Sequence, residues 1–409
     1  MTRPPLSAAL ATISTLRFGE TKMTHEQHPL DGIRVIDMTQ IYNGPYCTFL
    51  MAMAGADVIK VEPPGGEHLR RRNARGGALY PFKMLNPNKR SIVLDLKSNK
   101  GREIFLELAA TADVVVENFA PGVVDRLEVG HAAVKAINPS VVYASGSGYG
   151  QDGPYRGYQA MDIAVQAMGG VMGQTGFPEN PPVKAGVALC DFFAGIHLYG
   201  GIMTALVKRE RTGKGSYVDV SMQEAVFPSF ASNLGLMFDS EGTPSRVGNY
   251  HGGLSIAPYG VYPTMDGYTA IICNNDTHWA RLLKAMNKAY LMDDPRFVDM
   301  KARVDNLDAV TELITQWSSQ LKREEIMITL SAARVPCGSV KDLDEVVEDV
   351  NLHARGMIRW ITDAEGHRFL AAASPLHIDG ENMVDYRQPR EIDADREEIL
   401  GELENKRKQ

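Results

Sequence analysis

The side chain best suited to chemistry on its own is the aspartate at position 162. It lies in the stretch YRGYQAMDIAVQAMGGVMGQTGF, residues 155–177, where Arg156 is the only other charged residue. One interpretation is structural: carboxylates favour helix N-termini as caps or first-turn acids. The other is chemical: a carboxylate is ionised at neutral pH and can act as a nucleophile without a general base.

Cysteines and histidines form no metal or disulfide motif in this sequence. The cysteines are far apart and include no C-x-x-C pair: Cys47, Cys190, Cys273 and Cys337. No two histidines have the spacing of metal ligands on a helix, so we expect no metal. His197 lies in an apolar helical stretch and is expected in the core. His251 flanks Gly252 and Gly253 and is a candidate for a substrate contact, whereas the glycine pair itself could also be part of an ordinary flexible linker.

Glycine motifs that bind phosphates are also missing. The turn after the first predicted strand reads TQIYNGP, residues 39–45, instead of G-x-G-x-x-G. RTGKGS at 211–216 lacks the upstream glycine spacing of a P-loop. Neither dinucleotide nor P-loop chemistry is therefore indicated.

The elements that must position Asp162 alternate between strands and helices. Five apolar runs predict strands, at residues 33–38, 57–62, 91–96, 114–117 and 141–145. Helical patterns separate them, at residues 46–54 and 101–110 and from residue 123. Strand–helix–strand units of this length pair in parallel. The sequence therefore predicts an α/β fold with a doubly wound, mostly parallel, Rossmann-like sheet.

The second half of the chain changes character after two long helical stretches, 191–209 and 222–238. A linker pattern is followed by a hairpin with Asp266-Gly267 at its turn, three helical patterns and a second hairpin. We predict three parts: residues 29–240 as the large domain, 241–340 as a linker with a small α+β domain, and 341–409 as a C-terminal return to the large domain.

Composition predicts a globular protein that binds neither nucleic acid nor a membrane. The chain has 409 residues, is 44% hydrophobic and carries a net charge of −7 without a basic stripe. No apolar run reaches the roughly 18 to 20 residues that span a bilayer. Residues 1–28 are predicted to be a disordered extension. Residues 1–22 have the composition of a transit peptide, but they could equally result from a start codon assigned too far upstream. We expect a cytoplasmic protein, or a mitochondrial-matrix protein if 1–22 is a transit peptide.

Five motifs resemble the family III coenzyme A transferases, and they occur in that family's order. They are LDGIRVIDMTQIYNGPYCTFLMAMAGADVIKVEPPGG, NPNKRSIVLDLKS, DVVVENFAPGVVDRL, ASGSGYGQDGPY before Asp162 and TGKGSYVDVSMQEAV after it. This group contains formyl-CoA and crotonobetainyl-CoA transferases and α-methylacyl-CoA racemases. The resemblance implies a Rossmann-like large domain, a small domain and two ring-shaped subunits interlocked as a homodimer.

The resemblance also implies roles for individual residues. Asp162 matches the nucleophile of the transferases, which move coenzyme A from an acyl-CoA to a small carboxylic acid through an aspartyl anhydride and an aspartyl-CoA thioester. Gly252 and Gly253 match a mobile glycine loop that offers N–H donors to oxyanions. Tyr149 matches a tyrosine near the acyl group, although it is equally suited to the core. CoA is a substrate, and no tightly bound cofactor is implied. Matches to CoA-binding positions are Lys89, Arg90, Asn118, Phe119, Arg126 and Leu127.

Two departures from the family pattern narrow these expectations. Formyl-CoA transferases carry a glutamine where this chain has Tyr42 and a lysine where it has Ser147, so a formyl or oxalyl substrate is not implied. Tyr42 can keep a substrate contact but not the amide chemistry. Racemases carry a histidine where this chain has Met161, and racemisation needs both an acid and a base, which disfavours that alternative. A non-catalytic acyl-CoA-binding protein would leave Asp162 without a role.

Overall fold

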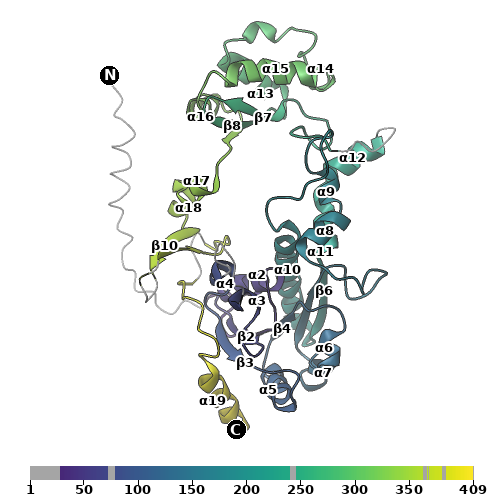
Figure 1. Cartoon of the computed structure of the whole chain (residues 1–409), viewed down its shortest axis with the longest axis vertical. Coiled ribbons are helices and arrows are strands. Elements are labelled where there is room, and N and C mark those ends of the chain that lie inside the picture. The colour runs from purple at the N-terminus through teal and green to yellow at the C-terminus, as the bar shows by residue number, and fades with distance from the viewer. Residues whose placement is uncertain are drawn as a thin grey trace.

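A six-stranded parallel sheet forms the centre of the larger part of the molecule (Figure 1). The structure is a computed structural model that describes residues 28–71, 79–239, 246–362, 366, 368–379 and 384–408. The strands are β1 Arg34–Asp37, β2 Asp57–Glu62, β3 Arg90–Val93, β4 Val114–Glu117, β5 Val142–Ser147 and β6 Ser216–Ser221. Their order is β3-β2-β1-β4-β5-β6, and neighbours pair in parallel. The predicted fold class is confirmed, with a reversal of strand order between β1 and β4.

Helices cover both faces of this sheet because its central strands are apolar on both sides. In β1, Val35 and Ile36 are fully buried and point to opposite faces. Val35 packs with Met51 and Leu198, and Ile36 packs with Phe105. The helices of this part are α2 Asn43–Ala52, α3 His68–Arg71, α4 Leu79–Leu85, α5 Asn99–Ala110, α6 Val123–Arg126, α7 His131–Ile137, α8 Asp162–Met168, α9 Val171–Gln174, α10 Leu189–Thr212, α11 Met222–Val226 and α12 Ala231–Asp239.

The longest helix, α10, packs along β5 and β6 and against α2. By length and composition it is the one helix of the described residues that could cross a membrane. Here its side chains Leu198, Ile202 and Ala205 are buried in the core beneath the sheet. The helix ends at Gly213, whose φ of 67° lies in the left-handed region that glycine adopts without strain.

The predicted helix over 222–238 is divided into three pieces. It comprises α11, a 3₁₀ turn at Phe227–Phe230 and α12. Pro228 lies at the start of the 3₁₀ turn, and a proline has no backbone N–H to continue an α-helix.

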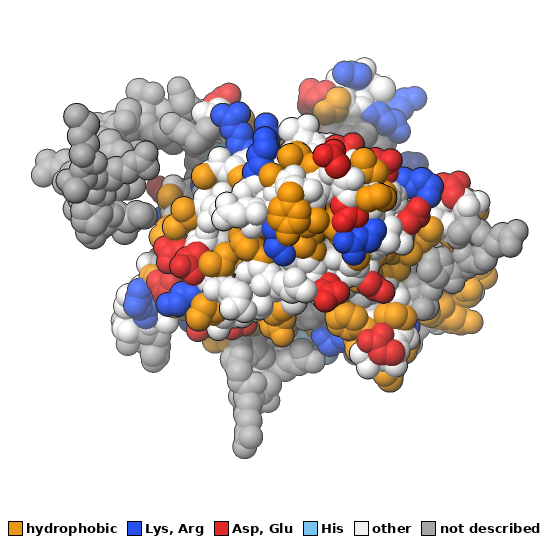
Figure 2. All heavy atoms as spheres, turned by 90° about the horizontal axis from the view of Figure 1, so that it is seen from above, with side chains coloured by type: hydrophobic (Ala, Val, Ile, Leu, Met, Phe, Trp, Pro, Cys, Tyr) orange, Lys and Arg blue, Asp and Glu red, His pale blue; other side chains and the backbone are white. Residues whose placement is uncertain are grey.

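A second, smaller core forms around a three-stranded antiparallel sheet. The strands are β7 Tyr259–Thr264, β8 Gly267–Ile272 and β9 Cys337–Ser339, in the order β7-β8-β9. Helices α13 Asp276–Ala285, α14 Met300–Asp305, α15 Leu307–Ser318 and α16 Arg323–Ala332 accompany it. Tyr262, Ile271, Trp279, Leu282 and Ile314 are buried together in this core. Seen from this end, acidic, basic and apolar side chains are intermixed over the described surface (Figure 2).

The chain then returns to the large sheet, so that the backbone follows a ring (Figure 1). The outgoing connection through α12 and the returning connection run on opposite sides of the molecule. The returning elements are α17 Leu343–Val347, α18 Val350–Ala354, β10 Ile358–Thr362, β11 Arg368–Ala372 and α19 Arg396–Arg407. In α19, Ile399 and Leu403 enter the same core cluster as Phe105 of α5. The predicted extension at 1–28 lies, apart from His28, outside the described residues.

Candidate active site

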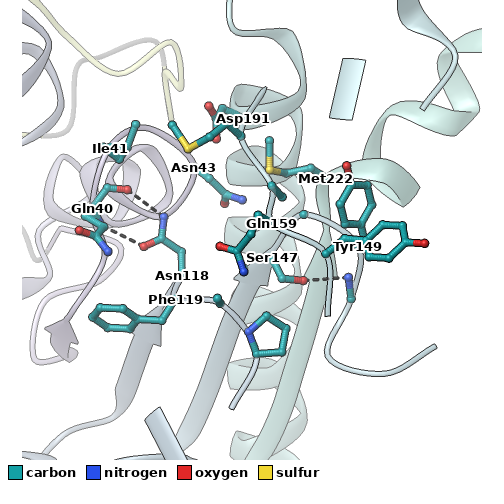
Figure 3. A pocket seen from close by; sticks show the side chains of 18 of the residues that line it. Gln40, Ile41, Asn43, Asn118, Phe119, Ser147, Tyr149, Gln159, Asp191 and Met222 are labelled. Carbon is teal, nitrogen blue, oxygen red and sulfur yellow. Dashed lines mark hydrogen bonds between the residues drawn. The ribbon is translucent and has the colours of Figure 1, made fainter. Parts of the chain in front are cut away.

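A pocket with a volume of about 530 Å³ opens at the carboxyl ends of β1, β4 and β5 (Figure 3). The strand order reverses at this place, and open α/β sheets bind their ligands there. Its walls come from the turns after these strands and from the starts of α10 and α11. The lining includes Gln40, Ile41, Asn43, Asn118, Phe119, Ser147, Tyr149, Gln159, Asp191 and Met222.

Asp162 borders this pocket, because it begins α8 directly after Ala160 and Met161, which line it. The carboxylate is partly exposed and does not cap its own helix. Oδ1 instead accepts hydrogen bonds from the backbone N–H groups of Cys190 at 2.9 Å and Asp191 at 3.2 Å, in the first turn of α10. These N–H groups have no partner within their own helix, and their partial positive charge attracts a carboxylate. Asp162 therefore starts one helix while a second helix orients its carboxylate.

Gln166 fixes the other oxygen of the same carboxylate. It lies one turn further along α8, is 1% exposed, and donates from Nε2 to Asp162 Oδ2 at 2.5 Å. Its own amide is fixed in turn, since Oε1 accepts from the Ala185 N–H at 2.8 Å and Nε2 also donates to the Val187 carbonyl at 3.2 Å. With both oxygens held, Asp162 has little rotational freedom, which favours a defined angle of attack on a bound molecule.

A second carboxyl group, that of Asp191, lies beside Asp162 and lines the pocket. It is 8% exposed, and burial raises its pKa to about 7, with a further contribution from the charge of Asp162 and an opposing one from the Asn43 N–H. The neighbouring thiol of Cys190 is buried as well, which raises its pKa to about 12. Cys190 therefore stays protonated and is a poor nucleophile, whereas Asp191 can exist in either protonation state.

The turn between β1 and α2 carries strain at the pocket wall. Ile41 has a φ of 68°, which is costly for a β-branched residue and recurs at functional sites. Asn43 follows as the first residue of α2, lines the pocket and is 3% exposed. Tyr42, the predicted substrate contact, is not among the lining residues, and its ring stacks on Phe192 at 6.0 Å instead. The turn thus presents Asn43 to the pocket, and not Tyr42.

Two predicted CoA-binding residues, Asn118 and Phe119, do line the pocket. The Asn118 side chain pairs with the backbone of Gln40, accepting from its N–H at 2.9 Å and donating to its carbonyl at 2.8 Å (Figure 3). Phe119 extends into a neighbouring, more apolar pocket that Leu127 also lines. These side chains offer a flat apolar surface beside a fixed amide.

Two arginines flank the turn at Gly122. A Cβ at Gly122 would lie 3.5 Å from a guanidinium nitrogen of Arg126 and 3.9 Å from one of Arg156. Both arginines are exposed, and Arg156 lines the pocket. Guanidinium groups bind phosphates and carboxylates in a bidentate manner, so this turn is suited to an anionic ligand.

Lys89 does not reach the pocket. It is 3% exposed, and its ammonium group donates to Asp37 at 3.0 Å and to Thr48 at 2.8 Å. Burial raises the pKa of the Asp37 carboxyl, but the ammonium groups of Lys60 and Lys89 outweigh it and hold that pKa well below its ordinary value. The prediction that Lys89 binds a phosphate of CoA is wrong, because its ammonium group is buried and paired with the Asp37 carboxylate.

The guanidinium group of Arg90 also pairs with other residues and does not reach the pocket. It forms ion pairs with Asp57 at 2.6 Å and with Glu402 of α19 at 2.6 Å. Since Arg90 begins β3, these contacts lie at the amino end of the sheet, opposite the pocket. Its predicted phosphate contact is therefore not supported.

The glycine pair and His251 lie away from this pocket within one chain. Gly252 lines a separate cavity of about 300 Å³. A Cβ at Gly252 would come within 2.9 Å of Asn233, and one at Gly253 within 2.9 Å of the Ser232 carbonyl. His251 accepts from the Gly253 N–H at 3.3 Å. Close packing on α12 explains both glycines here, and the structure does not bring them to Asp162.

Tyr149 lines the pocket, and its ring lies edge-on to Tyr155 at 6.1 Å and Tyr158 at 6.3 Å. Ser147 accepts from the Gly150 N–H at 2.9 Å and shapes the turn after β5.

The expectation of a core histidine at 197 is wrong, because His197 is exposed on α10. Within the described residues, no group of three or more His, Cys, Asp or Glu side chains is arranged to hold a metal ion.

Three polar residues of the site are absent from the sequence predictions: Asn43, Gln166 and Asp191. The spacing of Asp162 and Gln166 is a sequence signal, since residues four apart share a helix face. The closeness of Asn43, Asp162 and Asp191 has no such signal, because it depends on how α2, α8 and α10 pack together.

The chain matches one family model over most of its length. The model describes CoA-transferase family III and matches residues 30–395. Among similar proteins, a formyl-CoA:oxalate CoA-transferase of Streptomyces coelicolor is 37% identical, over 91% of this chain and 95% of its own. An acetyl-CoA:oxalate CoA-transferase of Acetobacter aceti is 39% identical, over 83% and 87%. A succinate–glutarate CoA-transferase of Agrobacterium fabrum is 32% identical, over 94% and 98%.

Solved structures with the same fold are also similar. A CAIB/BAIF family protein from Brucella suis has a TM-score of 0.80 and 34% identity, over 92% of this chain and 100% of that one. A protein of Mycobacterium tuberculosis has a TM-score of 0.81 and 26% identity, over 92% of this chain and 100% of that one.

Proposed function

This chain belongs to CoA-transferase family III, and we propose that it moves coenzyme A between carboxylates through covalent intermediates on Asp162. The donor is an acyl-CoA thioester and the acceptor is a small carboxylic acid. The observation that carries the proposal is the oriented carboxylate of Asp162 at the edge of a pocket where the strand order reverses.

The reaction exchanges one activated acyl bond for another in four steps. Asp162 attacks the thioester carbonyl, the C–S bond breaks, and CoA leaves as a thiolate from a mixed anhydride. The thiolate attacks the aspartyl carbonyl, which releases the donor acid as a carboxylate and leaves an aspartyl-CoA thioester. The acceptor carboxylate attacks this thioester, the C–S bond breaks, and CoA leaves again as a thiolate from a second anhydride. The thiolate then takes the acceptor acyl group and frees Asp162. Each bond formed is matched by one broken, so no ATP is needed.

The contacts of Asp162 support this sequence of steps. Oδ2, held by one side-chain amide, is the oxygen that becomes acylated, and Oδ1 remains the carbonyl oxygen of the intermediate. The N–H groups of Cys190 and Asp191 already donate to Oδ1. They stay in place when the thiolate attacks the aspartyl carbonyl and negative charge develops on that oxygen.

The acids that the relatives use suggest the class of substrate. Oxalate, succinate and glutarate appear in the names of relatives that are 32–39% identical to this chain. We propose a small carboxylic acid as the acceptor here, with the exposed Arg156 as a cation on the pocket wall that accommodates its charge or that of CoA.

Trapping tests the covalent intermediate directly. The protein is incubated with formyl-, acetyl- or succinyl-CoA and then with hydroxylamine, and the peptide that contains Asp162 is examined by mass spectrometry. We expect a hydroxamate at Asp162, and homoserine there after borohydride reduction. Asp162→Ala and Asp162→Asn should lose transfer by at least about 100-fold, or about 2.7 kcal/mol of barrier. Activity above this limit in a deamidation-free Asn variant would refute the nucleophile.

The same material separates transfer from racemisation. Met161 is 55% exposed and has no group that transfers protons, where a racemase needs one. Solvent deuterium should therefore not enter the α-carbon of a 2-methylacyl-CoA. Deuterium exchange without any adduct on Asp162 would favour the racemase.

We propose that two chains form an interlocked homodimer. The support is the ring-like course of the backbone and the number of large apolar side chains exposed between residues 155 and 238 (Figure 1). Exposed apolar surface of this kind marks association sites. Phe238 is 77% exposed, Val187 68% and Phe227 59%. Linked rings cannot separate without partial unfolding, so dilution should not produce folded monomers in analytical ultracentrifugation.

A further inference from the structure

The geometry points to Asn43 as a further catalytic residue, whose side-chain amide donates a hydrogen bond to the acyl oxygen that becomes negatively charged during transfer. This role rests on the proposed function, because it assigns a donor to the intermediates on Asp162. The structure supplies three observations for it: the burial of an unpaired amide, the direction of that amide and its link to Asp162 through Asp191.

The first observation is that Asn43 is buried and yet unpaired. The side chain is 3% exposed, and its Oδ1 is fully buried without a hydrogen-bond partner among the described residues. The buried amide of Asn138, by contrast, is paired: it is 8% exposed and donates to the carbonyls of Ala109 and Ala112 at 3.0 and 2.8 Å. Native proteins seldom leave a buried polar group unpaired. The unpaired buried atom is the acceptor Oδ1, so the donor role proposed here falls to the other atom of the amide, Nδ2.

The second observation is the direction of the amide. Asn43 lines the pocket, and Figure 3 shows its side chain pointing into the cavity between Asp191 and Ser147. The whole amide lies beside Gly146, where an added Cβ would come within 3.0 Å of Oδ1 and 3.3 Å of Nδ2. Glycine at 146 therefore makes room for this amide. Because Oδ1 is the fully enclosed atom of the amide, we assign Nδ2 as the end that faces the ligand, and an NH₂ group is a donor.

The third observation is the link to the nucleophile through Asp191. The backbone N–H of Asn43 faces the Asp191 carboxyl and lowers its pKa, and the backbone N–H of Asp191 donates to Asp162 Oδ1 at 3.2 Å. Asn43 and Asp162 are thus neighbours of the same residue, at the joint start of α2 and α10. We place the oxygen of a thioester carbonyl attacked by Asp162 on this side of the pocket, where Asn43 forms part of the wall.

The chemistry requires such a donor. When Asp162 adds to the thioester carbonyl, the C=O π electrons move to oxygen, and they return as the C–S bond breaks and the thiolate leaves. A buried donor aimed at that oxygen stabilises the charge in the transition state more than the neutral carbonyl in the ground state. Removing one such donor lowers kcat by about 10²- to 10³-fold in enzymes that use them.

Single-turnover trapping tests the assignment. Wild type, Asn43→Ala and Asn43→Asp are mixed with formyl-, acetyl- and succinyl-CoA, and adduct formation on Asp162 is followed by mass spectrometry. We expect Asn43→Ala to slow the adduct about 100-fold while the Kd for free CoA, from calorimetry, changes less than twofold. Asn43→Asp keeps the shape but replaces the donor by a carboxylate, and should lose at least as much. The matched control is Asn138→Ala, which removes a buried amide at the other end of the sheet and should form the adduct at the wild-type rate.

Two further outcomes keep the assignment separate from folding and from the proposed function. If Asn43→Ala unfolds in a thermal melt, Gly146→Ala displaces the amide without removing it, and adduct formation at the wild-type rate in that folded variant would overturn the assignment. A wild-type rate in folded Asn43→Ala would overturn it as well, and leave the transferase mechanism intact. If none of the three thioesters labels wild-type Asp162, the covalent mechanism and the role of Asn43 are both refuted.

Discussion

Replacing Asp191 by asparagine should remove a pH dependence that the folded protein owes to one buried acid. Asp191 is 8% exposed, and its pKa is raised to about 7, first by burial and then by the charge of Asp162. Asparagine has nearly the same shape and keeps a side-chain oxygen that can face the Asn43 N–H, but it cannot ionise. The substitution therefore isolates the cost of charging this group.

The sign and size of the effect follow from linkage between proton binding and folding. The folded state binds the Asp191 proton more tightly than the unfolded state, where the pKa is near 3.8. This contribution to stability is complete below about pH 4 and is lost as the pH rises through about 7. A rise from 3.8 to about 7 corresponds to about 4 kcal/mol, and about 2 kcal/mol of it is lost between pH 5.5 and 8.5.

Urea unfolding at pH 5.5 and pH 8.5, followed by circular dichroism at one fixed protein concentration, measures the effect. Between pH 5.5 and pH 8.5 the wild type should lose about 2 kcal/mol of its free energy of unfolding through the Asp191 carboxyl. Asp191→Asn has no such loss, so the difference in free energy of unfolding, variant minus wild type, should increase by about 2 kcal/mol. Asp162→Asn removes the second cause of the raised pKa and should make the wild-type pH dependence smaller. Parallel pH profiles for wild type and Asp191→Asn, or a change of the opposite sign, would show that the Asp191 carboxyl is not held as described.

Three other substitutions test further parts of the structure. Lys89→Met should lower the free energy of unfolding by about 3 to 5 kcal/mol, because it removes the ammonium group that is paired with the buried Asp37 and leaves only Lys60 to balance its charge. CoA affinity in calorimetry should not change, and loss of CoA binding in a folded variant would show that Lys89 does belong to the CoA site. Leu403→Ala should cost about 2 to 5 kcal/mol in urea unfolding, since Leu403 is 5% exposed in the core, and a cost below about 1 kcal/mol would show that α19 does not pack as described. Arg156→Ala should raise the Kd for CoA about tenfold, or about 1.4 kcal/mol, without changing the melting temperature. Lys135→Ala is its control away from the pocket, and equal effects of the two would contradict a specific contact.

The sequence predicts five of the six strands of the large sheet because their residues are apolar on both faces. Val114–Glu117, for example, is buried at every position. The edge strand β6 is not predicted. Its side chains alternate between exposed and partly buried, and it pairs with a single strand, β5. Burial on one face gives a shorter and weaker pattern than burial on two.

The same distinction between local and tertiary signals applies to the site. Asp162, Asn118 and Tyr149 belong to motifs and can be predicted. Asn43 and Asp191 become neighbours only when α2 packs on α10, where a Cβ at Gly195 would lie 2.7 Å from the Asn43 carbonyl. Lys89 is mispredicted for a related reason, because a lysine beside an arginine in sequence gives no indication of a buried partner 52 residues away.

The two faces of the large sheet have different consequences for synthesis on the ribosome. The core beneath α2 and α10 draws on residues between Val35 and Leu206, so it is complete when about half of the chain has emerged. The opposite core needs Ile399 and Leu403, which are among the last residues made. The small domain lies between them in sequence, and its core is complete at Val335. One face of the sheet thus remains open to solvent, and to chaperones, while a later domain is already able to fold.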